Sequence, residues 1–215
     1  MWLKEIIATA FGGLCCAVLI SVQPLQASEP VNLVVIGDSL TAGYGLPEAD
    51  AFPARLEQAL LKKGQAVRVV NAGVSGDTTA GGRARLAWAI GDQVDAVIVE
   101  LGANDALRGL APEQAFENLS AILKVLQDRK MPTLLAGMKA PPNMGEDYAR
   151  EFDALYQRLA SAYDVIFYPF FLEGVAGQPG LNQDDGLHPT AAGVDVIVEN
   201  IMPAVEELLA RANRK

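Results

Sequence analysis

The chain has 215 residues, of which 51% are hydrophobic and 20% are charged, and its formal net charge at pH 7 is −9. This length and composition are typical of a globular protein with enough apolar residues for one sizeable core. The acidic balance argues against a nucleic acid partner, because no run of Lys or Arg is longer than a pair and phosphate binding needs a concentrated basic surface.

The first 27 residues differ from the rest of the chain. Lys4 is followed by an uncharged, mostly apolar run over residues 6–22 and then by a polar stretch with a small residue at Ala27. This order predicts a signal peptide over residues 1–27 that is cleaved after Ala27. We therefore expect an exported protein with one mature domain over residues 28–215.

An uncleaved N-terminal anchor is the alternative. Glu5 offsets Lys4, and an apolar run of 17 residues is long for a signal peptide yet short for a membrane-spanning helix. After cleavage we expect no stable membrane insertion. Both cysteines, Cys15 and Cys16, lie in this segment, so the mature chain is predicted to have no disulfide and no cysteine ligand for a metal.

Apolar runs rich in β-branched residues alternate with amphipathic stretches along the rest of the chain. The runs are nearly continuous, a pattern typical of parallel strands that are covered on both faces. The alternation predicts an α/β fold, a three-layer α/β/α sandwich with a mainly parallel five-stranded sheet. The predicted strands span residues 31–37, 67–73, 94–102, 132–138 and 164–170, and the predicted helices span residues 51–64, 79–92, 111–130, 145–164 and about 189–210.

The first three predicted strands are each followed by polar or small residues that could form a site. Ser39 follows the first strand, Gly76 lies in the loop after the second, and Asn104 follows the third. In open α/β sheets ligands bind at the carboxyl ends of the strands, so these residues are candidates by position. The loop over residues 182–193, before the last predicted helix, is expected to open at the same end.

His188 is the single histidine of the chain, so a mechanism that needs an imidazole base must use it. Pro189 disfavours the α conformation at His188 and suits the first position of a helix, which predicts a stiff corner just outside the last helix. Asp185 could accept a hydrogen bond from one ring nitrogen, and Asp184 is the alternative. The other ring nitrogen could then activate the hydroxyl of Ser39, which is a poor nucleophile without a base.

An acyl-transfer site also needs hydrogen-bond donors for the oxyanion. The backbone N–H groups of Ser39 and Gly76 and the side-chain amide of Asn104 are the candidates, and Gly73 is an alternative backbone donor. Donors of this kind contribute roughly 10²- to 10³-fold each in turnover. The neighbouring carboxylates are expected to fix loops rather than to take part in chemistry. These carboxylates belong to Asp38, Asp77 and Asp105.

We expect no metal and no cofactor, because one histidine and no mature cysteine leave only carboxylates without ligand-like spacing.

An apolar acyl pocket is predicted after the fourth strand. Pro141, Pro142 and Met144 would form its wall. A monomer is the default expectation.

Four short motifs together resemble the blocks of the SGNH (GDSL) hydrolase superfamily. They are "GDSL" around Ser39, the glycine Gly76, "GAND" around Asn104 and "DGLHP" around His188, in this order. Longer segments such as "NAGVSGDTTAGGRARL" are similar to its periplasmic multifunctional esterases. The resemblance implies a flavodoxin-like fold, a periplasmic location, Ser39 as nucleophile and His188 as base oriented by Asp185. It also implies an oxyanion hole formed by the Ser39 N–H, the Gly76 N–H and Asn104.

The resemblance further implies a serine esterase that forms an acyl-enzyme on Ser39. Its expected substrates are small carboxylic esters and thioesters, namely aryl esters, acyl-CoA-type thioesters and lysophospholipids. A carbohydrate O-acetyl esterase is the alternative within the family. An exported module that binds a small ligand without catalysis is the alternative outside it, although it leaves the Ser, Asn and Asp-x-x-His pattern unexplained.

Overall fold

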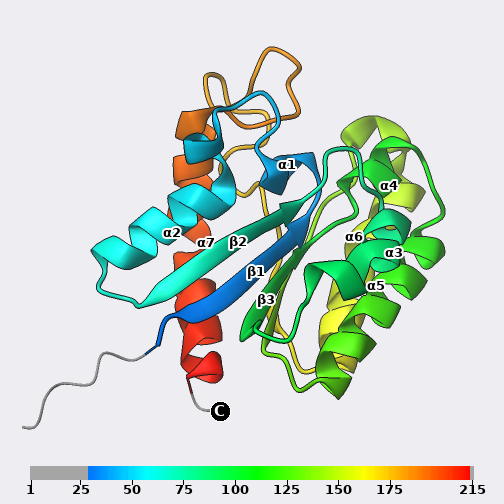
Figure 1. Cartoon of the computed structure of the whole chain (residues 1–215). Coiled ribbons are helices and arrows are strands. Elements are labelled where there is room, and N and C mark those ends of the chain that lie inside the picture. Colours follow the sequence, from blue (N-terminus) through cyan, green and yellow to red (C-terminus); the bar gives the residue numbers. More distant parts are fainter. Residues whose placement is uncertain (1–28, 214–215) are drawn as a thin grey trace, which may run out of the picture.

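The computed structural model describes residues 29–213 (Figure 1). The predicted signal peptide, with Cys15 and Cys16, lies outside the described residues. Five parallel strands form one sheet in the order β2-β1-β3-β4-β5. The strands are β1 (Val31–Gly37), β2 (Val67–Gly73), β3 (Ala96–Glu100), β4 (Thr133–Ala136) and β5 (Ile166–Tyr168).

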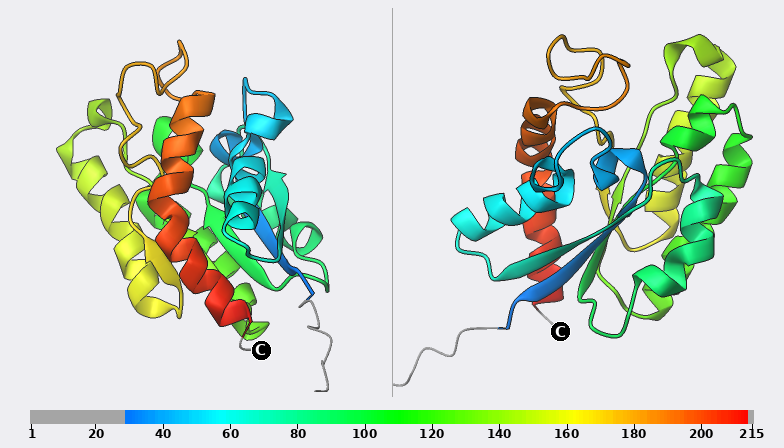
Figure 2. Two further views of the ribbon diagram at one scale, coloured as in Figure 1. Left: turned by 90° about the vertical axis from the view of Figure 1, so that its left-hand side faces the viewer. Right: turned by 45° about the horizontal axis from the view of Figure 1, so that its top comes forward.

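Helices cover both faces of this sheet, so the predicted three-layer α/β/α sandwich is confirmed (Figures 1 and 2). One face is covered by α2 (Phe52–Lys62) and α7 (Ala191–Ala212). The other face is covered by α3 (Thr79–Ala89), α5 (Pro112–Asp128) and α6 (Glu146–Ala162). The short elements in the connecting loops are α1 (Ser39–Ala42), α4 (Ala103–Leu107) and the 3₁₀ helices η1 (Glu48–Asp50) and η2 (Pro142–Met144).

Two aromatic groups illustrate how each layer packs on the sheet. On the side of α2, the rings of Phe52 and Phe171 meet edge to face with centroids 5.0 Å apart. On the side of α6, Phe152 and Tyr156 meet in the same way at 5.8 Å, and the Tyr156 hydroxyl donates to the Leu101 carbonyl at 2.8 Å. Burial of each such side chain contributes about 1.5–3 kcal/mol. Helices thus pack on both faces of the sheet, and the loops at its edge extend from this packed core.

The prediction that β2 is covered on both faces is wrong. Arg68 and Asn71 are exposed, and Val70 keeps 38% of its surface accessible, although Val67 is buried. β2 lies at the end of the sheet and pairs with β1 alone. An apolar run therefore does not require burial on both faces, because the position of a strand in the sheet decides how much of it is covered.

The last helix begins two residues later than predicted. It starts at Ala191, and the hydroxyl of Thr190 accepts from the Gly193 N–H at 3.2 Å as its N-cap. Thr190 N–H donates to the Leu181 carbonyl, and Pro189 forms an isolated antiparallel bridge with Asn182. Pro189 therefore belongs to the loop rather than to the first turn of the helix. No helix within residues 29–213 is long and apolar enough to cross a membrane.

Candidate active site

Ser39 lies at the carboxyl end of the buried central strand β1. Asp38 caps the short helix α1, with Oδ1 accepting from the Leu40 N–H at 3.0 Å, and Ser39 is the first residue of that helix. The strand order reverses between β1 and β3, so the loops that follow these two strands leave the sheet in opposite directions. Such a switch point is where open α/β sheets bind their ligands.

The structure brings Ser39, His188 and Asp185 together in one relay. His188 Nε2 lies 2.9 Å from Ser39 Oγ, and His188 Nδ1 lies 2.6 Å from Asp185 Oδ2. The second oxygen of the Asp185 carboxylate accepts from two backbone N–H groups, those of Leu187 at 2.9 Å and His188 at 3.0 Å. This carboxylate is thus held in place by the loop as well as by the ring.

The hydrogen bonds to Asp185 keep it ionised. The backbone N–H and then the ring of His188, followed by the Leu187 N–H, lower the pKa of this carboxyl to about 2. An ionised carboxylate on Nδ1 fixes the ring tautomer and stabilises the imidazolium. Among the described residues the ring of His188 makes no hydrogen bond with Asp184, so the geometry favours Asp185 over the alternative.

The amide of Asn104 joins the two segments that carry the candidate backbone donors. Its Nδ2 donates to Asp38 Oδ2 at 3.2 Å, next to Ser39, and to the Asp77 carbonyl at 3.0 Å, next to Gly76. Within residues 29–213 the backbone N–H groups of Ser39 and Gly76 donate no hydrogen bond. These two N–H groups are available to a bound group, whereas both hydrogens of the Asn104 amide already have partners.

The loop around Gly76 has a conformation that suits glycine. Gly76 has φ +85°, which L side chains rarely adopt, and its carbonyl accepts from Arg108 Nη2 at 2.8 Å. The alternative donor Gly73 is different, because its N–H donates to Asn71 Oδ1 at 2.9 Å. The structure therefore leaves the Gly76 N–H, and not the Gly73 N–H, available for an oxyanion.

The carboxylates near the site fix loops, as expected. Asp105 Oδ1 accepts from the Thr79 hydroxyl at 2.6 Å and its Oδ2 from the Thr79 N–H at 2.8 Å, while Asp77 pairs with Arg85. The Arg85 guanidinium also donates to the Gly37 carbonyl at 2.9 Å, at the end of β1. Sequence reasoning missed Arg85 and Arg108, because the position of an arginine in the sequence does not show which loop its side chain reaches.

Sequence reasoning also missed Glu100, whose buried carboxyl group lies next to Asp38. Glu100 ends β3 with no exposed surface, and the Asp38 N–H donates to its Oε2 at 3.4 Å. Burial raises the pKa of Asp38 to about 6, and burial followed by the charge of Asp38 raises the pKa of Glu100 well above its usual range. A glutamate at the end of an otherwise apolar strand was the available signal.

The predicted pocket wall lies beside the segment that carries Asn104. Pro142 and Met144 belong to η2, and the Met144 Cε lies 3.2 Å from the position that a Cβ on Gly109 would take, just after α4. Pro141 precedes η2 and is half-buried. This placement is compatible with an acyl pocket on the Asn104 side of the site, and contact of these residues with an acyl chain stays a prediction.

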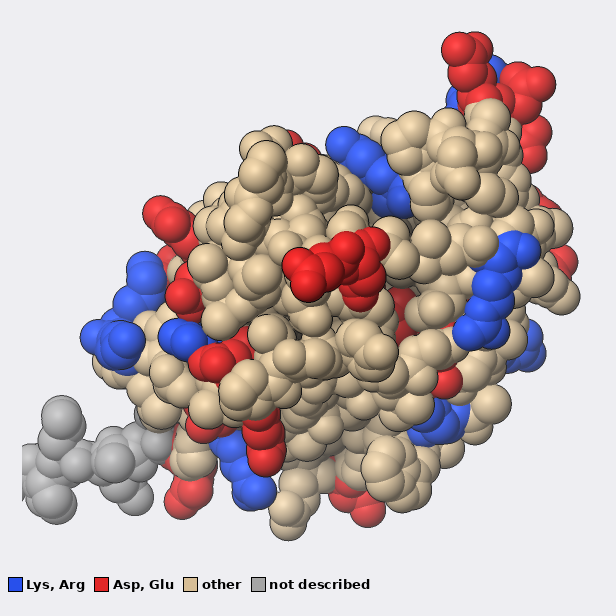
Figure 3. All heavy atoms as spheres, turned by 90° about the horizontal axis from the view of Figure 1, so that it is seen from above, with Lys and Arg blue, Asp and Glu red and all other residues tan. Residues whose placement is uncertain are grey.

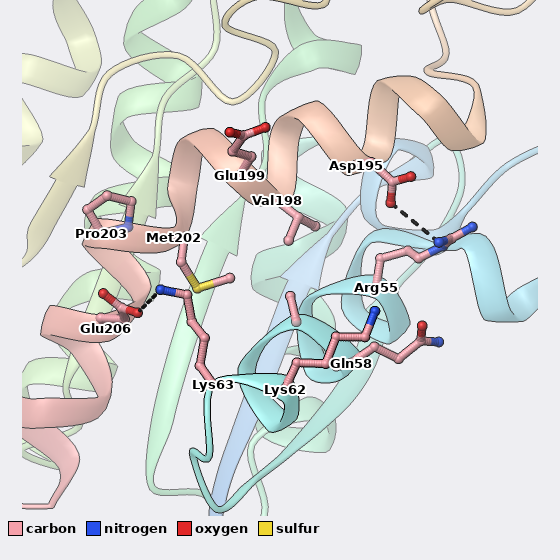
Figure 4. A pocket seen from close by; sticks show the side chains of 11 residues that line it. Arg55, Gln58, Lys62, Lys63, Asp195, Val198, Glu199, Met202, Pro203 and Glu206 are labelled. Atoms are coloured by element: carbon pink, nitrogen blue, oxygen red, sulfur yellow. Dashed lines mark hydrogen bonds and ion pairs between the residues drawn. The ribbon is translucent and has the colours of Figure 1, made fainter.

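A groove of about 450 Å³ lies elsewhere, between α2 and α7 (Figure 4). Its rim carries Lys62 and Lys63 at the end of α2 and Glu199 and Glu206 on α7, and Lys63 pairs with Glu206 at 2.8 Å. None of the candidate catalytic residues lines it. The groove is therefore separate from the relay at the end of β1.

The face at the carboxyl ends of the strands is largely uncharged (Figure 3). Acidic side chains lie near its middle, and most Lys and Arg side chains lie towards its rim. In the part of the chain that the structure describes, no group of three or more His, Cys, Asp or Glu side chains could hold a metal ion.

Comparisons with known proteins identify the family of the chain and several of its relatives. The model of the GDSL-like Lipase/Acylhydrolase family matches residues 35–196. The arylesterase of Vibrio mimicus is 44% identical over 165 residues, which cover 76% of this chain and 82% of the relative. Thioesterase 1/protease 1/lysophospholipase L1 of Escherichia coli K12 is 41% identical over 76% of this chain and 78% of its own length. A crystal structure of TesA superposes with a TM-score of 0.79 at 40% identity, covering 82% of this chain and 99% of TesA.

Proposed function

The chain belongs to the GDSL-like lipase/acylhydrolase family and is a carboxylic ester hydrolase, and we propose that it is a serine enzyme that works through an acyl-enzyme on Ser39. One observation carries this assignment. The relay from Ser39 Oγ to His188 Nε2, and from His188 Nδ1 to Asp185, has distances of 2.9 and 2.6 Å. Both lie within the range that proton transfer between a nucleophile and its base requires.

In the first half of the reaction, His188 Nε2 takes the proton of Ser39 as Oγ attacks the acyl carbonyl carbon. The imidazolium then gives this proton to the leaving alkoxide or thiolate, and the bond between the acyl carbon and the leaving group breaks. In the second half a water molecule loses its proton to His188 and attacks the acyl-enzyme. Collapse releases the carboxylic acid and returns the proton to Ser39.

The oxyanion that forms in each half is stabilised by three donors. They are the backbone N–H groups of Ser39 and Gly76 and the side-chain amide of Asn104. Asp185 stays ionised throughout, because the hydrogen bonds that it accepts hold its pKa at about 2. Its part is to orient the ring of His188 and to stabilise the imidazolium, without taking the proton.

The substrates that we assign are small esters and thioesters. Arylesterase and thioesterase/lysophospholipase relatives support aryl esters, acyl-CoA-type thioesters and lysophospholipids as the substrate classes. The acyl chain would lie against Pro141, Pro142 and Met144. We further propose that the enzyme is exported to the periplasm through residues 1–27, acts as a monomer and has no nucleic acid partner.

The test is hydrolysis of p-nitrophenyl esters from C2 to C16 by the mature protein, with Ser39→Ala alongside. We expect activity that is lost in the variant and that increases from acetate towards longer chains. Activity confined to acetate would indicate a carbohydrate O-acetyl esterase instead. If Ser39→Ala retained most of the activity while folding normally, the serine mechanism would be wrong.

A further inference from the structure

We propose that Gln183 is a positioning residue for this reaction, which fixes the distance between Ser39 and His188 by tying together the two loops that carry them. The proposal rests on the function proposed above. Gln183 does not touch the reacting atoms. It acts through the backbone of both loops.

The side-chain amide of Gln183 uses both of its hydrogens to join the loops. Its Nε2 donates to the Tyr44 carbonyl at 2.8 Å and to the Pro189 carbonyl at 2.9 Å. The backbone N–H of Gln183 donates to the His188 carbonyl at 2.7 Å. Gln183 therefore holds two consecutive carbonyls, those of His188 and Pro189, and connects them to a residue 139 positions earlier in the chain.

Tyr44 is itself fixed to the nucleophile. The backbone N–H groups of Gly43 and Tyr44 both donate to the Ser39 carbonyl, each at 3.2 Å. The ring of Tyr44 lies against the imidazole of His188, with centroids 4.6 Å apart and planes inclined by 37°. A shift of the Tyr44 backbone would therefore move both the serine segment and the ring that packs on the base.

Gly45 supplies an independent observation. A Cβ at this position would lie 2.3 Å from Gln183 Oε1, and Gly45 has φ +75°. A residue with a side chain would thus push the amide of Gln183 away from Tyr44. The absence of a side chain at position 45 is what allows the loop to approach this amide so closely.

Few hydrogen bonds join the two loops directly. In the described part of the chain only two hydrogen bonds join residues 39–46 to residues 182–190, the Gln183–Tyr44 bond and the Ser39–His188 contact itself. Without Gln183, the two loops would be joined only by the Ser39–His188 hydrogen bond itself and by the contact between the rings of Tyr44 and His188. A misplacement of about 1 Å between reacting groups can cost on the order of 10²-fold in rate.

The test compares Gln183→Glu with Gln178→Glu, a control that makes the same change on an exposed side chain of the same region. The Gln183→Glu change keeps the size of the side chain but turns an oxygen towards two carbonyls. We expect kcat for p-nitrophenyl butyrate to fall by about 10- to 100-fold, with KM and the melting temperature nearly unchanged. The second-order rate of Ser39 labelling by a fluorophosphonate should fall in parallel, and Gln178→Glu should match the wild type in all four measurements.

Gln183→Met, which has no charge and no donor, serves as the second variant in case Gln183→Glu prevents folding. An unchanged kcat and labelling rate in either folded variant would overturn the proposal, as would an effect on KM alone. Failure of both variants to fold would make Gln183 a structural residue and would also overturn it. A wild type that is inactive, or whose activity survives Ser39→Ala, would instead contradict the proposed function, so the two failures are distinguishable.

Discussion

The side-chain amide of Asn104 donates to the carboxylate of Asp38, the residue before the candidate nucleophile, across 3.2 Å. Its second hydrogen is taken by the Asp77 carbonyl at 3.0 Å. The amide is therefore oriented before a substrate arrives. An oxyanion has to share a hydrogen that one of these two oxygens already holds, and Asp38 and Asp77 decide where the amide points.

We expect Asn104→Ala to lower kcat by about 10²- to 10³-fold, because a donor to the oxyanion is worth most in the transition state. KM should change much less, since the substrate carbonyl carries little charge before attack. Steady-state kinetics with a p-nitrophenyl ester measure both constants. Asn213→Ala, an exposed position at the end of α7, is the control and should behave as the wild type. A change in KM alone would contradict an oxyanion role for Asn104.

Asp184 and Asp185 are adjacent, so the same substitution at each of them tests which one orients His188. We expect Asp185→Asn to lower kcat by about 10²- to 10⁴-fold, because an amide can hold the ring of His188 in the wrong tautomer and carries no charge to stabilise the imidazolium. Asp184→Asn should leave kcat within about twofold, as is usual for exposed side chains without a partner in the site. Kinetics of the two variants, with circular dichroism as a check of folding, separate the two residues. Equal losses in both would show that the assignment to Asp185 is wrong.

Substitution of two glycines with positive φ separates a loss of activity from a loss of stability caused by backbone strain. Gly76 has φ +85° and Gly177 has φ +71°, and a Cβ at either position meets nothing closer than 3.9 Å. Gly76→Ala and Gly177→Ala should each lose about 1–2 kcal/mol of stability, which is the cost of a left-handed conformation for an L residue. We expect kcat to fall about 10-fold or more only in Gly76→Ala, where the strained peptide carries the N–H donor. Urea denaturation and kinetics of both variants provide the comparison, and similar kcat values would remove Gly76 from the oxyanion hole.

The buried carboxyl of Asp38 predicts a pH dependence of stability. Its pKa is 3.8 when unperturbed and about 6 in the folded protein, so the folded state binds the proton more tightly. The contribution of Asp38 is therefore complete below pH 3.8 and is lost as the pH rises through 6, by about 3 kcal/mol in total. Urea denaturation between about pH 4 and 7 measures how steeply the free energy of unfolding falls with pH. This fall should be less steep in Asp38→Asn than in the wild type.

Asp92→Asn is the control for this pH series, because Asp92 is fully exposed and should leave the slope unchanged. Asp185 has the opposite sign, since its lowered pKa stabilises the folded state above pH 3.8 and the effect disappears as the pH falls through about 2. Within the series it therefore adds slope only at the acidic end, between about pH 4 and 5, and little above that range. A wild-type curve parallel to that of Asp38→Asn would contradict a raised pKa of Asp38.

Most of the architecture could be predicted from local patterns in the sequence. The runs at 31–37 and 67–73 are strands with the predicted bounds, because continuous β-branched residues favour extended backbone and alternating helices impose parallel pairing. Asp185 and His188 could be paired from the sequence since they are three residues apart within one loop. Their geometry depends on local turns, which the glycine between them allows.

Other features were decided only by the tertiary structure. The sequence of β2 does not reveal that it lies at the sheet edge, and Glu100 resembles any polar residue at a strand end until the helices close over it. The hydrogen bond from the Asn104 amide to Asp38 and the bond from Gln183 to Tyr44 likewise join segments that are far apart in the chain. Sequence patterns report the preferences of neighbouring residues, whereas burial, pKa and the distance between Ser39 and His188 depend on which surfaces the fold brings together.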